Sequence, residues 1–177
     1  MTRNLNLLGL WGLSTILLFA FLDQIVLHDL PCPLCLLQRA AFVAAGVGFA
    51  LNVTFGSSPA HYGVTLLSAI AGAAMSARQI LLHIVPGSGS FGQPFLGLHF
   101  YTWGLTAFVL TAVAVGVLLL VEETAAPGHG RSAATPASRV AVGLFLALAL
   151  ANAASTLLEC GPGMCPDNPV SYQLLRW

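Results

Sequence analysis

The sequence contains no lysine, and charged residues make up only 7% of its 177 positions. Six arginines balance six acidic residues, so the composition indicates neither a basic surface for nucleic acid nor a polybasic patch for anionic lipid. Hydrophobic residues account for 57% of the chain, and the mean hydropathy is +0.86. Too few charges remain to cover a soluble globule of this length. We therefore expect the folded chain to face a lipid bilayer and to have no nucleic-acid partner.

Five apolar segments reach or approach the length of about 20 residues that an α-helix needs to cross a bilayer. They occupy residues 5–27, 36–55, 62–84, 98–121 and 140–158. The sequence therefore predicts an all-α integral membrane protein with five transmembrane helices. Because five is an odd number of crossings, the two termini are expected on opposite sides of the membrane.

The arginines indicate which side of the membrane faces the cytoplasm. Arg3 precedes the first segment, and Arg131 and Arg139 lie between the fourth and fifth segments, which parity places on the same side. Three arginines fall on the other side, so the bias is weak by count, but a functional role explains Arg39 and Arg78 near helix ends. We therefore expect a cytoplasmic N-terminus and a periplasmic C-terminus.

The four cysteines form two pairs. The sequence C-P-L-C occupies residues 32–35, between the first two apolar segments, and Cys160 and Cys165 follow the last segment. An even number of crossings separates the pairs, so both emerge on one face of the membrane. In the expected orientation that face is the periplasm, where disulfides persist, whereas cytosolic thiols are kept reduced. Two dithiol pairs on an oxidising face indicate an electron relay.

The first pair has the setting of a helix N-terminus. Pro33 suits the first turn of a helix, so the second helix is expected to start at Cys32 or Pro33, with both sulfurs in its first turn. A thiolate there is stabilised by the positive end of the helix dipole and by unpaired amides. Arg39 follows Cys35 by one helical turn, on the same face and about 6 Å deeper. An arginine at that depth either marks a ligand or partner charge or extends to the interface, and both interpretations stay open.

A C-x-x-C pair is also half of many zinc sites. A structural zinc takes four nitrogen or sulfur ligands, and Cys160 and Cys165 are available to complete such a set. Their spacing is at the edge of the usual range for zinc ligands, and on an oxidising face metal binding competes with disulfide formation. We therefore expect no metal.

The run C-P-L-C-L-L-Q-R at residues 32–39 resembles the C-x-x-C-x-x-x-R signature of the bacterial disulfide bond formation protein B (DsbB) family. Two further stretches are similar to the family pattern: R-Q-I-L-L-H at residues 78–83, and F-L-G-L at residues 95–98 followed by Trp103. The resemblance covers roughly residues 5–121. It implies a four-helix quinone-reducing bundle over residues 1–121, a cytoplasmic linker over 122–139, and an added unit over 140–177. That unit holds a fifth, peripheral transmembrane helix and a periplasmic tail with cysteines.

The resemblance also implies a function in the bacterial inner membrane. Such a protein reoxidises a periplasmic DsbA-like protein of thioredoxin fold and passes the electrons to the membrane quinone pool, with ubiquinone or menaquinone as the cofactor. Carried over to this sequence, Cys35 lies nearest the quinone, Cys32 exchanges with a second disulfide, and Arg39 lies beside a quinone oxygen. Arg78 and His83 are weaker candidates for contact with the quinone, and His83 has the alternative explanation of a polar residue at a helix end.

The sequence departs from the family in the place of the second cysteine pair. Family members typically carry it in the loop between the third and fourth helices, but residues 86–97 contain no cysteine here. Cys160 and Cys165 instead follow the extra helix, and parity keeps them on the same face as Cys32. They either relay electrons to the first pair, form a structural disulfide that closes a small loop, or remain unpaired.

Two other functions stay open. An enzyme of the vitamin K epoxide reductase type also places C-x-x-C beside a quinone in a helical bundle, although there the motif falls late in the bundle rather than after the first helix. A small membrane transporter or assembly protein would use the cysteines only as structural disulfides. That last alternative predicts that Cys35→Ser leaves function unchanged and that no quinone copurifies with the protein.

Overall fold

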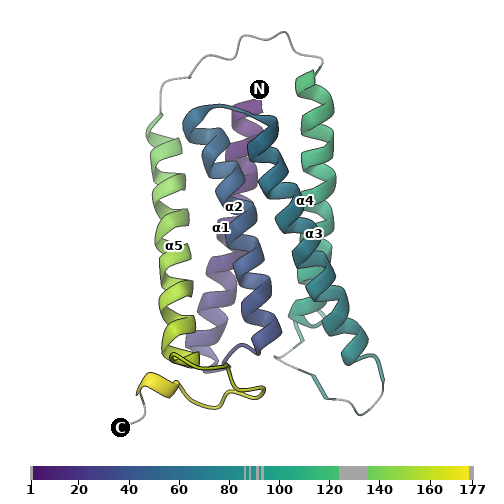
Figure 1. Cartoon of the computed structure of the whole chain (residues 1–177), viewed down its shortest axis with the longest axis vertical. Coiled ribbons are helices and arrows are strands. Elements are labelled where there is room, and N and C mark those ends of the chain that lie inside the picture. The colour runs from purple at the N-terminus through teal and green to yellow at the C-terminus, as the bar shows by residue number, and fades with distance from the viewer. Residues whose placement is uncertain are drawn as a thin grey trace.

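The computed structural model describes residues 2–85, 87, 89–90, 92, 94–123 and 135–175. Five α-helices run side by side along the long axis of the molecule, and a short 3-10 turn follows them (Figure 1). The elements are α1 (Thr2–Val26), α2 (Pro33–Phe55), α3 (Pro59–Leu82), α4 (Phe100–Glu123), α5 (Pro136–Cys160) and η1 (Gln173–Leu175). No strand occurs among the described residues, and the predicted all-α class with five long helices is confirmed.

Three of the helices begin at a proline that lies before the apolar segment predicted for that helix. Pro33, Pro59 and Pro136 open α2, α3 and α5, where a proline costs no hydrogen bond, and the side chain of the preceding residue caps each helix. α5 consequently starts before the predicted residue 140, and α4 continues past the predicted residue 121 to Glu123. The predicted linker over 122–139 is therefore too long at both ends, and its residues 124–134 lie outside the described part of the chain.

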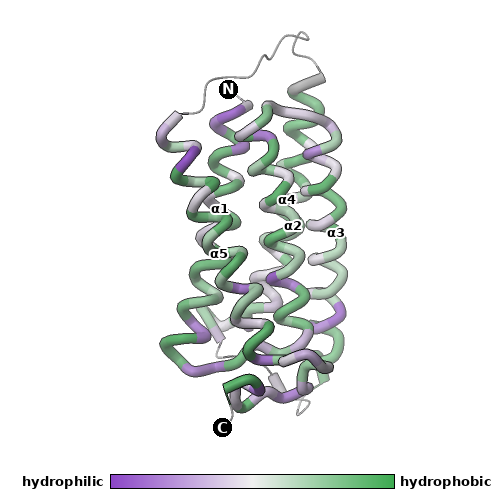
Figure 2. Tube along the Cα trace, turned by 60° about the vertical axis from the view of Figure 1, so that its left-hand side comes forward, coloured by the Kyte–Doolittle hydropathy of each residue, from purple (hydrophilic) through white to green (hydrophobic). Residues whose placement is uncertain are grey.

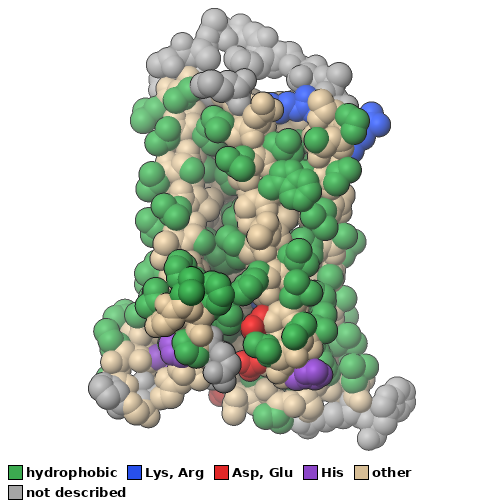
Figure 3. Space-filling model, turned by 180° about the vertical axis from the view of Figure 1, so that it is seen from behind, with side chains coloured by type: hydrophobic (Ala, Val, Ile, Leu, Met, Phe, Trp, Pro, Cys, Tyr) green, Lys and Arg blue, Asp and Glu red, His purple; other side chains and the backbone are tan. Residues whose placement is uncertain are grey.

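All five helices are long and apolar enough to cross a membrane. In the most apolar window of each helix at most 50% of the residues are buried within the protein, so the others face outward. Hydrophobic residues occur along the whole length of the bundle (Figure 2), and apolar side chains are spread over the face shown in Figure 3. On that face the arginines lie at one end and the acidic side chains lie toward the other. Helices with apolar outer surfaces of this kind are stable in lipid, so the chain is a multi-pass membrane protein.

The fifth helix is part of the bundle. α5 packs against both α1 and α2, while α3 packs against α2 and α4. The approach of α5 to α2 depends on Gly46, because a Cβ atom there would overlap the fully buried ring of Phe145. Gly72 of α3 and Phe108 of α4 form a similar pair. Among the described residues, α5 has no contact with α3 or α4 and so lies at the edge of the bundle, as predicted for a peripheral helix, but a small residue on α2 lets a large side chain of α5 pack into the core.

The two ends of the chain lie at opposite ends of the bundle, as an odd number of crossings requires (Figure 1). The start of α2 and the end of α5 both lie at the end that carries the C-terminus, and we call this the cysteine end because it holds both cysteine pairs. The predicted placement of the two pairs on one face is thus confirmed. At the opposite end, Arg3 of α1 donates a 3.0 Å hydrogen bond to Ser138 Oγ of α5.

Candidate redox site

The first cysteine pair is a disulfide at the start of α2. Cys32 caps the helix with an extended backbone, and its Sγ accepts a hydrogen bond of 3.1 Å from the Cys35 amide. The two Cα atoms are 5.0 Å apart. Cys32 is buried and Cys35 is half-buried. The prediction that α2 starts at this motif, with both sulfurs at its N-terminus, is confirmed.

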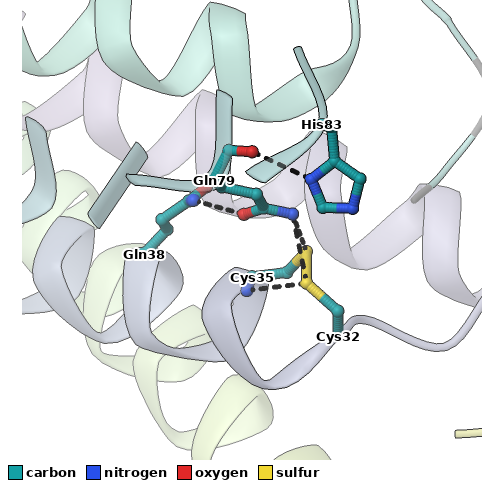
Figure 4. Close-up of a disulfide and its surroundings, with 5 residues drawn as sticks. All are labelled: Cys32, Cys35, Gln38, Gln79 and His83. Carbon is teal, nitrogen blue, oxygen red and sulfur yellow. Dashed lines mark hydrogen bonds between the residues drawn. A yellow bond between two sulfur atoms is a disulfide. The ribbon is translucent and has the colours of Figure 1, made fainter. Parts of the chain in front are cut away.

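A side-chain amide from α3 contacts both sulfurs (Figure 4). Gln79 is fully buried and donates from Nε2 to Cys32 Sγ at 3.3 Å and to Cys35 Sγ at 3.5 Å. Its Oε1 accepts a hydrogen bond of 2.7 Å from Gln38 Nε2, which fixes the direction in which the amide faces. Because the nitrogen points at the sulfurs, Gln79 is placed to stabilise negative charge on either of them.

Sequence reasoning does not single out Gln38 or Gln79, although they lie inside the motifs at residues 32–39 and 78–83. The available signal is their polarity, because a polar side chain in a spanning helix is costly unless it has a partner. The partner itself is not visible in the sequence. Gln79 meets the disulfide only when α3 packs against α2.

A mostly apolar cavity of about 480 Å³ lies beside the disulfide. It is formed between α1, α2 and α4, and its wall includes both cysteines of the first pair and Arg39. Aromatic and aliphatic side chains make up much of the wall, among them Leu17, Phe19, Phe42, Phe100, Tyr101 and Leu110. A cavity that combines apolar walls with a few polar groups is typical of a binding site for a small organic molecule.

Arg39 lies in the wall of this cavity and is held against α1. Its Nη1 donates to Gln24 Oε1 at 2.6 Å, and its Nη2 donates to the Ala20 carbonyl oxygen at 2.8 Å. It also interacts electrostatically with Glu159 of α5 and with Asp23 of α1. The sequence leaves open whether Arg39 marks a ligand or partner charge or extends to the membrane interface. The structure favours a ligand or partner charge, because the guanidinium finds its partners inside the bundle.

Arg78 and His83 are not among the described residues of the cavity wall. Arg78 is exposed. His83 follows the last residue of α3, where its Nδ1 lies 2.8 Å from the Gln79 carbonyl oxygen (Figure 4). Its ring stacks on Tyr101 with 5.7 Å between the centroids. Of the residues predicted to contact a quinone, the described structure thus brings Arg39 to the cavity together with the cysteines.

The second cysteine pair is a disulfide between the last residue of α5 and the tail. Cys160 is buried and Cys165 is half-buried, with 4.4 Å between their Cα atoms. Gly161 makes the turn after the helix with a φ of +63°, which favours glycine. Met164, in the loop that the disulfide closes, is 93% exposed. The alternative of unpaired thiols is therefore wrong, and the relay and structural alternatives remain.

Comparison with known proteins gives a family match over the half of the chain that contains the first disulfide. The family model described as Disulfide bond formation protein DsbB matches residues 2–91. A protein named Disulfide bond formation protein B from Pseudomonas syringae pv. tomato is 38% identical over 152 residues, covering 67% of this chain and 89% of the relative. A protein of the same name from Burkholderia pseudomallei is 34% identical over 152 residues, with the same coverage. No solved structure gives a significant match.

Proposed function

Because this chain belongs to the disulfide bond formation protein DsbB family, we propose that it is a thiol:quinone oxidoreductase of the bacterial inner membrane. It reoxidises a periplasmic DsbA-like dithiol protein of thioredoxin fold and passes the electrons to ubiquinone or menaquinone. The observation that carries the proposal is the Cys32–Cys35 disulfide in the wall of an apolar cavity that also holds Arg39. A purely structural disulfide needs neither the cavity nor the cation. Family membership also favours this function over that of a vitamin K epoxide reductase-type enzyme.

The residues of the cavity fit a quinone head group. The walls are mostly apolar, and Arg39 and Gln38 supply polar groups for the ring oxygens. A bound quinone would supply a two-electron, two-proton acceptor: the dithiol loses two electrons and two protons as it closes to a disulfide, and the quinone would take up both to give the quinol. Arg39 keeps its charge at any physiological pH, so it stabilises negative charge that develops on an oxygen beside it.

Within the first pair we assign Cys35 to the acceptor and Cys32 to thiol exchange. Cys35 lines the cavity and is the more exposed of the two residues, which supports its role. When the pair is reduced, Gln79 donates to the sulfur that carries the thiolate, and the N-terminal amides of α2 add to the stabilisation. Cys32 is only 3% exposed, so exchange at its sulfur requires movement of the residues that cover it.

Electrons reach the first pair through the second in this proposal. The Cys160–Cys165 disulfide lies at the same end of the bundle, and the exposure of Met164 leaves its loop accessible to a soluble dithiol protein. The partner's dithiol closes to a disulfide as the Cys160–Cys165 bond is reduced. The new dithiol then reduces the first disulfide and closes again, and each exchange moves two electrons and two protons without a further reactant.

The proposed orientation places the cysteine end in the periplasm. Arg3 and Arg139 lie at the opposite end, which supports a cytoplasmic N-terminus by the positive-inside rule. Arg131, the third arginine expected on that side, lies outside the described residues. A periplasmic cysteine end gives the second disulfide an oxidising environment and access to soluble partners.

Turnover of the purified, oxidised protein in detergent tests this function. Reduced DsbA-like protein and ubiquinone are added, menaquinone is tried in parallel, and the absorbance of the quinone is followed. We expect quinone consumption that depends on the protein and is lost in Cys35→Ala. Cys160→Ser and Cys165→Ser, tested separately, are expected to stop turnover with the dithiol protein. Unchanged turnover in Cys35→Ser would contradict the proposal and favour purely structural disulfides.

A further inference from the structure

One buried side chain links the arginine of the cavity to the C-terminal part of the chain. Gln24 lies near the end of α1 and is 2% exposed. Its Oε1 accepts the 2.6 Å hydrogen bond from Arg39 Nη1. Its Nε2 donates to Ser155 Oγ at 2.8 Å and to Tyr172 Oη at 2.9 Å. Ser155 belongs to α5, and Tyr172 belongs to the tail that follows it, so both lie far along the sequence from the arginine.

The chemistry of these groups selects one orientation of the Gln24 amide. An arginine side chain has only N–H donors, so Gln24 must present its oxygen to Arg39. The amide nitrogen then points the other way and needs acceptors, which the hydroxyls of Ser155 and Tyr172 supply. Loss of a hydroxyl leaves a buried N–H unsatisfied and lets the amide turn away from the arginine.

We propose that Ser155 and Tyr172 are positioning residues for Arg39. They hold the amide of Gln24, and Gln24 and the Ala20 carbonyl together hold two nitrogens of the guanidinium against α1. This restraint keeps the guanidinium in the wall of the cavity. The inference rests on the proposed function, because the position of Arg39 matters for catalysis only when a quinone occupies that cavity.

Both positioning residues lie outside the region matched by the family model. That match ends at residue 91, whereas α5 begins at Pro136 and the tail follows α5. The segment that carries the second disulfide therefore also completes the surroundings of the arginine. In this chain the C-terminal addition serves the redox site in two ways, through its cysteines and through two hydroxyl groups.

Tyr172→Phe tests the inference because it removes one hydroxyl with little change in packing. We expect kcat/KM for quinone to fall about 3- to 10-fold, the usual effect of one lost hydrogen bond. The single-turnover rate of electron uptake from the dithiol protein, measured without quinone, should not change. A Tyr172→Phe protein with unchanged kcat/KM for quinone would overturn the inference.

Tyr62→Phe is the matched control. The Tyr62 hydroxyl accepts a 2.7 Å hydrogen bond from Asn6 Nδ2 at the opposite end of the bundle, and Tyr62 is fully buried whereas Tyr172 is half-buried. The control variant is expected to keep both rates. An equal loss of kcat/KM in Tyr62→Phe and Tyr172→Phe would overturn the inference, because the effect would then be one of general stability.

A double-mutant cycle shows whether Tyr172 acts through Arg39. Arg39→Lys keeps the charge but lacks the planar fork that binds two acceptors at once. Adding Tyr172→Phe to Arg39→Lys is therefore expected to have no further effect on kcat/KM, since the restrained group is already gone. A full second loss in the Arg39→Lys background would overturn the inference.

A measurement without quinone separates failure of this inference from failure of the proposed function. The side-chain amide resonances of Gln24 in isotope-labelled protein are expected to shift in Tyr172→Phe and to stay in place in Tyr62→Phe. If Tyr172→Phe shifts the Gln24 resonances but the wild-type protein reduces no quinone, the contact between Tyr172 and Gln24 would be supported and the proposed function overturned. Unshifted Gln24 resonances in a protein that does reduce quinone would overturn the inference alone.

Discussion

The two disulfides of this chain lie at the same end of the bundle but in different surroundings. The Cys32–Cys35 pair has an amide donor on both sulfurs and an apolar cavity beside it. The Cys160–Cys165 pair closes a short loop in which Met164 is 93% exposed. The first environment stabilises charge on sulfur beside an apolar space, and the second gives access from solution. Under the proposed function, this difference corresponds to a division of work between a site for a membrane-dissolved acceptor and a site for a soluble protein.

The largest difference between the two disulfide sites is expected when Arg39, beside the first disulfide, is replaced. Arg39→Gln should lower kcat/KM for quinone by about 10²- to 10³-fold, the usual effect of removing a group that stabilises developing negative charge. Electron uptake by the second disulfide should be unchanged. Quinone consumption at varied quinone concentration provides the first measurement, and single-turnover oxidation of the dithiol partner provides the second.

Arg78→Gln is the matched control for this variant. Arg78 is exposed and is not among the described residues of the cavity wall, so its replacement is expected to leave quinone reduction close to that of the wild type. Equal losses of kcat/KM for quinone in Arg39→Gln and Arg78→Gln would contradict the assignment of Arg39 as the cation that serves the first disulfide.

An intermediate effect is expected from the amide beside the first disulfide. Gln79→Leu removes the donor to both sulfurs, and hydrogen bonds to charged groups are worth about 1.5 to 3 kcal/mol, so quinone reduction should slow about 10- to 100-fold. Rapid mixing of chemically reduced protein with excess quinone measures this rate. A Gln79→Leu protein that reduces quinone at the wild-type rate would limit the amide to a role in packing.

The smallest effect is expected at His83. Its ring is hydrogen-bonded to a backbone carbonyl at the end of α3 and stacks on Tyr101. His83→Ala should therefore lower the free energy of unfolding by about 0.5 to 1.5 kcal/mol. It should slow quinone reduction less than about 3-fold. Thermal unfolding in detergent and the turnover assay measure the two quantities. A loss of turnover as large as that of Gln79→Leu would instead indicate a role for His83 in proton transfer.

The helices and the start of α2 could be predicted because their signals are local in the sequence. Apolar length alone gives the five spans, and Pro33 together with the C-x-x-C spacing gives a helix N-terminus at the cysteines. The same spacing puts Arg39 on the face of α2 that lines the cavity. The family follows from these residues as well, and the comparisons confirm it.

The contacts between helices could not be predicted, because they join residues far apart in the sequence. Gln24 reaches Ser155 across 131 positions, and Gln79 reaches Cys32 across 47. A polar residue in an apolar helix signals the need for a partner but does not identify it. Tyr172 gives no signal at all, since it lies in an irregular tail without periodicity. The packing of α5 into the core was missed for the same reason.

The number of electrons delivered to quinone tests the central claim most directly. The protein is reduced completely, its four thiols are counted, and quinone is added in the absence of oxygen. Because each of the two dithiols carries two electrons, we predict that the wild type reduces two quinones per chain, Cys160→Ser/Cys165→Ser reduces one, and Cys32→Ser/Cys35→Ser reduces none. A wild type that reduces no quinone, or a Cys32→Ser/Cys35→Ser protein that still reduces one, would contradict electron exit through the first disulfide.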